Sequence, residues 1–236
     1  MEKCPEVGKN VIVQLDSINI DLANLQLLVL SLSTEPSTLQ MQKPEHHLNT
    51  ALSIKRRLMS WHASLPPSWH PKRVSGPECI SPTIHQAGLY QHYCDVYPSI
   101  SIARSFNEYR ISLMKTESIL LSCLGNQPPS LTNFTSQAAC QNRIQQVADD
   151  ICASVPFHIG NRINPGNFGD KKVQYPHAPG EAVPDEHYEI APLIGGYHLL
   201  DPLGGLLRMQ IKLRNGQRQW VGGQMMRISR IYNIGK

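Results

Sequence analysis

Tyr197, His198 and Asp201 are the residues of this 236-residue sequence whose types and spacing could support catalysis. In a helix, Tyr197 and Asp201 lie about one turn apart on the same face, and His198 lies three residues before Asp201. A histidine at the wall of a pocket can act as a general base while a neighbouring carboxylate orients its ring. We therefore predict Asp201 and His198 as acid–base residues and Tyr197 as a ligand contact. The alternative is that Asp201 is solvated beside Pro202, near a helix break.

A second group of polar residues forms a stripe on an otherwise apolar segment. Arg104, Asn107 and Arg110 follow one another at intervals of three residues. Because a guanidinium group forms paired hydrogen bonds with oxygen acceptors, we predict that this stripe contacts an anionic or carbonyl-bearing ligand. The alternative is a structural role, in which Asp149 and Asp150 are the partners of these side chains.

His158 completes the candidate site residues, and no motif for a metal or cofactor accompanies them. It follows Pro156 and Phe157 near the end of an apolar segment, where it is either a ligand contact or a buried or capping histidine. None of the six cysteines forms a CxxC pair, and the sequence has no glycine-rich phosphate loop. We therefore predict neither a metal nor a cofactor.

The elements that must position these residues are predicted to be helices. Hydrophobic residues recur near the helical period, whereas the alternation typical of strands appears nowhere. Residues 161–190 contain many prolines and glycines and no sustained periodicity, so we predict a flexible loop or lid there. We predict an all-α fold of seven to nine helices in one domain, residues 1–236. The predicted helices span residues 10–32, 44–63, 82–97, 99–124, 136–154, 191–213 (interrupted by Pro202) and 217–231.

Composition excludes several classes of protein. Hydrophobic residues make up 41% of the chain and the net charge is only +4, which excludes overall disorder. The same charge is too mild to predict direct nucleic-acid binding. The longest apolar run, residues 27–30, is far shorter than a membrane span. We therefore predict an intracellular protein of the nucleus or cytoplasm that does not associate with membranes.

Four segments resemble a known family in the order in which that family carries them. They contain the sequences YP and FNEYR within residues 97–110, ADDICASVPFHIG at 148–160, GGYHLLDPL at 195–203, and QRQW with ISRIYNIG within 217–235. These segments are similar to those of the fungal-specific transcription factor domain, the C-terminal regulatory region of fungal zinc-cluster regulators. The resemblance covers about residues 44–235 and implies an all-helical regulatory domain.

Two departures from that family pattern shape the functional prediction. The sequence lacks the six-cysteine zinc cluster through which such regulators read DNA. In addition, Asp201 stands where the family usually carries a large apolar residue, and a carboxylate on an apolar face is costly unless it is paired.

The resemblance and its departures lead to two functional predictions. The first is a regulator-like protein without a DNA-binding module that binds a small metabolite or a protein partner, either another regulator or a second copy of itself. The second is a cofactor-independent enzyme of secondary metabolism, of cyclase, isomerase or lyase type, with Asp201 and His198 as acid and base. Both predictions use a cavity between the helices at 99–124 and 195–213, with residues 161–190 over its mouth.

Overall fold

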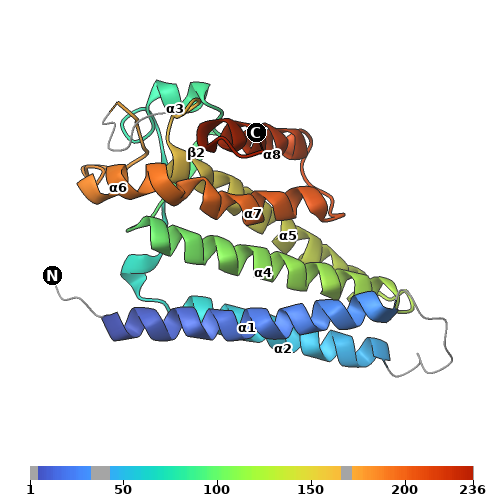
Figure 1. The fold of residues 1–236 in the computed structure, drawn as a ribbon. Helices are drawn as coiled ribbons and strands as arrows, with labels where there is room; N and C mark the ends of the chain where they lie inside the picture. Colours follow the sequence, from blue (N-terminus) through green and yellow to red (C-terminus); the bar gives the residue numbers. More distant parts are fainter. Residues whose placement is uncertain (1–4, 33–42, 166–171, 236) are drawn as a thin grey trace. The chain divides into compact units, whose positions relative to one another are not determined.

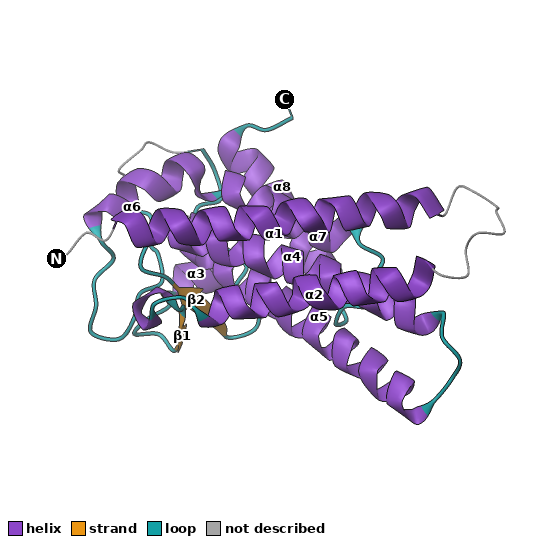
Figure 2. Cartoon of the chain, turned by 90° about the horizontal axis from the view of Figure 1, so that it is seen from below, coloured by secondary structure: helices purple, strands orange, loops and turns teal. Residues whose placement is uncertain are grey.

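The computed structural model describes residues 5–32, 43–165 and 172–235. Helix accounts for 69% of the structure and strand for 4%, so the predicted all-α class is confirmed. The described residues form eight α-helices and two short strands (Figures 1 and 2). The helices are α1 (Pro5–Leu32), α2 (Lys43–Ala63), α3 (Pro82–Gln86), α4 (Ile100–Gly125), α5 (Leu131–Ile159), α6 (Asp185–Ile190), α7 (Tyr197–Arg208) and α8 (Gln217–Tyr232); the strands are β1 (Lys72–Ser75) and β2 (Tyr93–Val96).

The chain divides into two compact units, and α4 and α5 each contribute residues to both. Unit 1 contains Met1–Leu65 and Ile111–Val147, and unit 2 contains Pro66–Arg110 and Ala148–Lys236. The assignment of the whole chain to one domain stays a prediction. All the candidate site residues belong to unit 2.

Unit 1 is built around α1 and α2, which lie side by side (Figures 1 and 2). The buried residues Leu15, Ile18, Leu22 and Leu25 recur every three or four positions, which places them on one face of α1. The indole Nε1 of Trp61 donates a hydrogen bond to the carbonyl oxygen of Val11 at 2.8 Å, which joins the two helices by a polar contact as well.

Unit 2 contains the strands that the sequence did not predict. β1 and β2 pair antiparallel, and β2 lies within the segment 82–97 that we expected to be one helix. The helix ends early because Gly88 and Gln91 adopt φ angles of 103° and 57°, which are left-handed values outside the helical range. The prediction of a helix over 82–97 is therefore wrong beyond α3, and the expected absence of strands is wrong as well.

Helix α5 is longer at both ends than its apolar pattern predicted. It begins at Leu131 and continues through Pro156 to Ile159, beyond both ends of the predicted span 136–154. Proline removes one backbone hydrogen bond and disfavours helix, but burial of the last turn stabilises the helix here. The extension matters because it places Phe157 and His158 on a helix inside the core of unit 2.

The segment predicted as a long loop contains one short helix, α6, within its described residues, 161–165 and 172–190. The prediction of a flexible lid also falls on residues 166–171, which lie outside the described residues. A π-helical turn at Ala191–Gly195 then leads into α7, which packs against α8 (Figure 1). The guanidinium of Arg218 on α8 donates hydrogen bonds to four carbonyl oxygens at and after the end of α7, those of Leu206, Leu207, Met209 and Ile211.

Candidate functional site

Gly195 and Gly196 allow three of the segments that resemble the family to lie in close contact. These segments are residues 148–160, 195–203 and 217–235. A side chain at Gly195 would meet the carbonyl oxygen of His158 at 2.1 Å, and one at Gly196 would meet the ring of Tyr232 at 2.2 Å. The backbone N–H of Gly196 also donates a hydrogen bond to the hydroxyl of Tyr232 at 2.9 Å. The start of α7 therefore packs directly on the end of α5 and the end of α8, because neither glycine carries a side chain.

Arg110 and Asn107 belong to a buried hydrogen-bond network. Arg110 forms an ion pair with Asp95 at 3.0 Å, and their side chains are only 6% and 2% exposed. It also donates to the hydroxyl of Tyr97 and, at 3.1 Å, to the amide oxygen of Asn107. Asn107 in turn donates to the hydroxyl of Ser154 at 2.9 Å. This arrangement favours the structural interpretation of both residues.

The predicted partners of the stripe, Asp149 and Asp150, are engaged elsewhere. Asp149 accepts hydrogen bonds from Arg214, Gln217 and Tyr90, and Asp150 forms an ion pair with Arg73. The ion-pair partner of Arg110 is Asp95, which lies on β2, an unpredicted strand. Arg104, the third residue of the stripe, is exposed and pairs with Glu108 one turn along α4 at 2.7 Å.

His158 is fully buried and belongs to a group of three histidines in unit 2. Its ring centroid lies 6.2 Å from that of His198, and its Nδ1 has no hydrogen-bond partner among the described residues. Burial lowers the pKa of His158 well below its ordinary value, and the nearby His198 and His187 lower it further. Burial also lowers the pKa of His198. His158 is therefore neutral at neutral pH.

The predicted acid–base pair on α7 is not joined by a hydrogen bond among the described residues. The carboxylate of Asp201 is 63% exposed and forms an ion pair with Arg208 at 3.0 Å. His198 is half-buried, and its Nδ1 has no hydrogen-bond partner in the part of the chain that the structure describes. Tyr197 is exposed and packs edge-on against Tyr232, with ring centroids 5.0 Å apart. This geometry favours the solvated alternative for Asp201.

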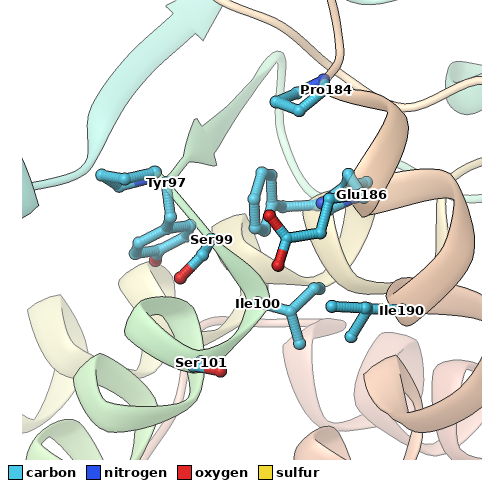
Figure 3. Close-up of a pocket in the computed structure, with 10 residues that line it drawn as sticks. Tyr97, Ser99, Ile100, Ser101, Pro184, Glu186 and Ile190 are labelled. Carbon is cyan, nitrogen blue, oxygen red and sulfur yellow. The ribbon is translucent and has the colours of Figure 1, made fainter. Parts of the chain in front are cut away.

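A cavity of about 110 Å³ lies in unit 2 at the start of α4. Its lining comes from residues 97–101, from Phe157 near the end of α5, and from Pro184 and three residues of α6. Figure 3 shows Ile100 and Ile190 facing each other, and the carboxylate of Glu186 turned toward Ser99. The predicted cavity used α7 as a wall, whereas this one is walled by α4 and by the segment that was predicted as a lid.

His187 is the lining residue whose chemistry stands out. Its side chain is buried, and its ring centroid lies 4.4 Å from that of Phe157 and 4.5 Å from that of Tyr175. Its Nε2 has no hydrogen-bond partner among the described residues. Burial lowers the pKa of His187 to about 4. The ring is therefore neutral at neutral pH.

Sequence reasoning missed His187 because it lies in the segment predicted as a loop. One signal for α6 was present, since Pro184 is followed by Asp185 and Glu186, acidic residues that favour the first turn of a helix. No signal in the sequence indicated that the histidine after them would be buried.

The comparisons with known proteins identify no relative. No family model matches the chain, and neither a curated protein nor a solved structure matches it. Within the described residues, no group of three or more metal-ligating side chains is placed to hold an ion. Across the same part of the chain, every helix is too short or too polar to span a bilayer.

Proposed function

We propose that this chain is a regulator-like protein that binds a small molecule in the cavity at the start of α4. The observation that carries the proposal is the cavity itself, which measures about 110 Å³. Ile100, Phe157 and Ile190 give it apolar walls, and Ser99, Ser101 and Glu186 supply polar groups. Small-molecule sites typically combine apolar walls with a few polar groups in this way.

The assignment to a fungal regulator type rests on the four sequence segments described above. In unit 2 the segments at 148–160, 195–203 and 217–235 pack on one another through Gly195 and Gly196, which is consistent with their belonging to one structural unit. The predicted protein partner or dimer stays a prediction.

The alternative of a cofactor-independent enzyme receives less support from the geometry. Asp201 would have to leave its ion pair with Arg208 before it could orient His198. Neither Asp201 nor His198 lines the cavity at the start of α4. The regulator-like function is therefore the one that we put forward.

The proposal is tested by recovering the bound molecule from purified protein. Ser101 lines the cavity at the second position of α4, and we expect Ser101→Phe to fill it. Thr132→Phe is the matched control, since Thr132 is exposed at the second position of α5 in unit 1. Mass spectrometry of small molecules released on denaturation should detect a compound with the wild type and Thr132→Phe but not with Ser101→Phe. Identical profiles for all three proteins would contradict the proposal.

The choice between regulator and enzyme is tested by deleting the gene in its native host. We expect transcripts of neighbouring genes to change while no single intermediate accumulates. Accumulation of one metabolite with unchanged transcripts would instead favour the enzyme.

A further inference from the structure

We infer that the exposed face of α1 binds a second copy of this chain, so that the two α1 helices pair antiparallel in a weak dimer. This inference goes beyond the proposed function, because α1 belongs to unit 1 and every residue that lines the cavity at the start of α4 belongs to unit 2. It follows from three properties of the face: its apolar pattern, its charge and its area.

Apolar side chains run along the side of α1 that lies opposite its buried side. Val13, Ile20 and Leu27 are 64%, 62% and 66% exposed, and they recur every seven residues. Seven residues are about two helical turns, so the three side chains form one line along the helix. Ile12 and Leu30 are exposed at the edges of this line. A seven-residue apolar repeat is typical of a helix that pairs with another helix.

The charge of α1 favours a protein surface over a membrane. Between residues 11 and 30 the helix carries Asp16 and Asp21 and neither lysine nor arginine. Helices that lie on a bilayer are instead rich in lysine and arginine on their polar face. Asp21 forms an ion pair with Arg57 of α2, which leaves Asp16 as the charge that a partner must accommodate.

Antiparallel pairing makes the face complementary to itself. With a twofold axis at Ile20, this residue meets its own copy, and Val13 of each chain meets Leu27 of the other. Asp16 lies four residues from the axis, so the two Asp16 residues are about 12 Å apart along the helices, beyond the screening length at physiological salt. Parallel pairing would place the two carboxylates at the same level, where they repel each other.

The exposed area of the face suits a weak dimer. A fully exposed aliphatic side chain presents roughly 60–120 Å² of apolar surface, so the five partly exposed side chains present about 200–350 Å² on each copy. Because about 57% of a typical interface is non-polar, the dimer would bury about 700–1,200 Å² in total. This range includes the roughly 1,000 Å² that a specific interface needs.

Sedimentation of the full chain between about 5 and 500 µM tests the inference. We expect a monomer–dimer equilibrium with a Kd of about 10–100 µM for the wild type. Ile20→Glu places two carboxylates at the twofold axis, so it should raise the Kd about 100-fold or more. Leu131→Glu is the matched control, since Leu131 is 84% exposed at the first position of α5 in the same unit, and it should leave the Kd unchanged.

A charge exchange tests the direction of pairing. Val13→Lys should raise the Kd about ten-fold or more, because it places a charge against an apolar side chain. Adding Leu27→Glu to the same chain should recover part of this loss, since antiparallel helices bring positions 13 and 27 together. In a parallel dimer each new charge would meet its own copy, and the double variant would dimerise no better than Val13→Lys alone.

Each outcome supports or overturns the inference. A wild type that remains monomeric at about 500 µM contradicts it, and flotation of that monomer with phosphatidylcholine vesicles would show that the face binds a bilayer instead. A dimer that survives in a folded Ile20→Glu must use another surface. A double variant that dimerises no better than Val13→Lys overturns the antiparallel arrangement. The concentration series on the wild type stands even where a variant fails to fold.

Discussion

Burial decides what the two arginines of the α4 stripe do. Arg110 is enclosed with Asp95, and a buried guanidinium that lost its carboxylate would remain as an uncompensated charge. Arg104 lies on the exposed face of the same helix and pairs with Glu108 where water screens both charges. Arg110 therefore stabilises the core, whereas Arg104, six positions earlier, forms an ion pair at the surface.

Replacing each arginine with methionine separates these roles. Arg110→Met leaves Asp95 buried with one of its two arginine partners, Arg73, so we expect a loss of about 3–5 kcal/mol in the free energy of unfolding. Arg104→Met should cost less than about 1 kcal/mol. Urea denaturation followed by circular dichroism measures both. A loss below about 1 kcal/mol for Arg110→Met would contradict the structural role and favour ligand binding.

The buried histidines make stability depend on pH. The ordinary histidine pKa is 6.5, whereas the folded protein lowers the pKa of His187 to about 4. The unfolded chain therefore binds the proton more readily, so the contribution of His187 to stability is complete above pH 6.5 and is lost as pH falls toward 4. The maximum loss is roughly 3 kcal/mol for this residue.

Thermal unfolding between pH 7.5 and 4.5 tests this dependence. We expect the decline in melting temperature of the wild type to be shallower in His187→Phe and unchanged in His92→Phe. Equal slopes for all three proteins would show that His187 is protonated in the folded state as readily as in the unfolded state.

At the scale of elements, the contacts between the ends of helices determine where the buried histidines lie. The π-helical turn before α7 approaches the end of α5 so closely that a methyl group at Gly195 has no space. Gly222 on α8 faces open space, so the same added methyl group meets nothing there. Replacing either glycine with alanine adds the same methyl group, so the two positions differ in the packing around that group.

Alanine at each glycine measures that difference. Gly195→Ala must push against a backbone carbonyl, and we expect it to lower the free energy of unfolding by about 1–3 kcal/mol. Gly222→Ala should raise it by about 1 kcal/mol, because alanine favours helix. Chemical denaturation of both variants gives the comparison. Stabilisation by Gly195→Ala would mean that α7 does not pack on His158 as described.

The long helices were predictable from the sequence and the short elements between them were not. α1, α4 and α8 carry apolar residues at helical spacing over many turns, so their existence was correctly expected. β2 depends on pairing with a strand about twenty residues away, and α6 has fewer than two turns. The sequence patterns of β2 and α6 are therefore too short to be distinguished from those of an irregular segment.

At the scale of the whole molecule, the basic residues near the C-terminus are largely used within the chain. Arg218 and Arg227 donate hydrogen bonds to backbone carbonyls, and Arg214 pairs with Asp149. These three side chains therefore have partners within the chain, and we keep the prediction that the chain does not bind nucleic acid directly.

Fluorescence anisotropy with a labelled DNA duplex tests the consequence. At physiological salt we expect binding no tighter than the non-specific range of about 10⁻⁴–10⁻⁶ M. Nanomolar binding to the duplex would contradict the prediction that the chain does not contact nucleic acid directly.

The candidate site as a whole could be predicted only in part. Arg110, Asn107 and His158 were predicted as ligand contacts because they are polar residues in apolar segments, and all three are buried in the structure. Their use in an internal network depended on Asp95, whose position follows from a strand pairing that no spacing in the sequence indicates. His187 became visible only when tertiary packing buried it beside Phe157.

The most direct test of the account is mass spectrometry of the small molecules released from purified protein, because it asks whether the cavity at the start of α4 holds a ligand. We expect a compound from the wild type and from Thr132→Phe, and none from Ser101→Phe. Release of the same compounds from all three proteins, or of none from the wild type, would contradict the account.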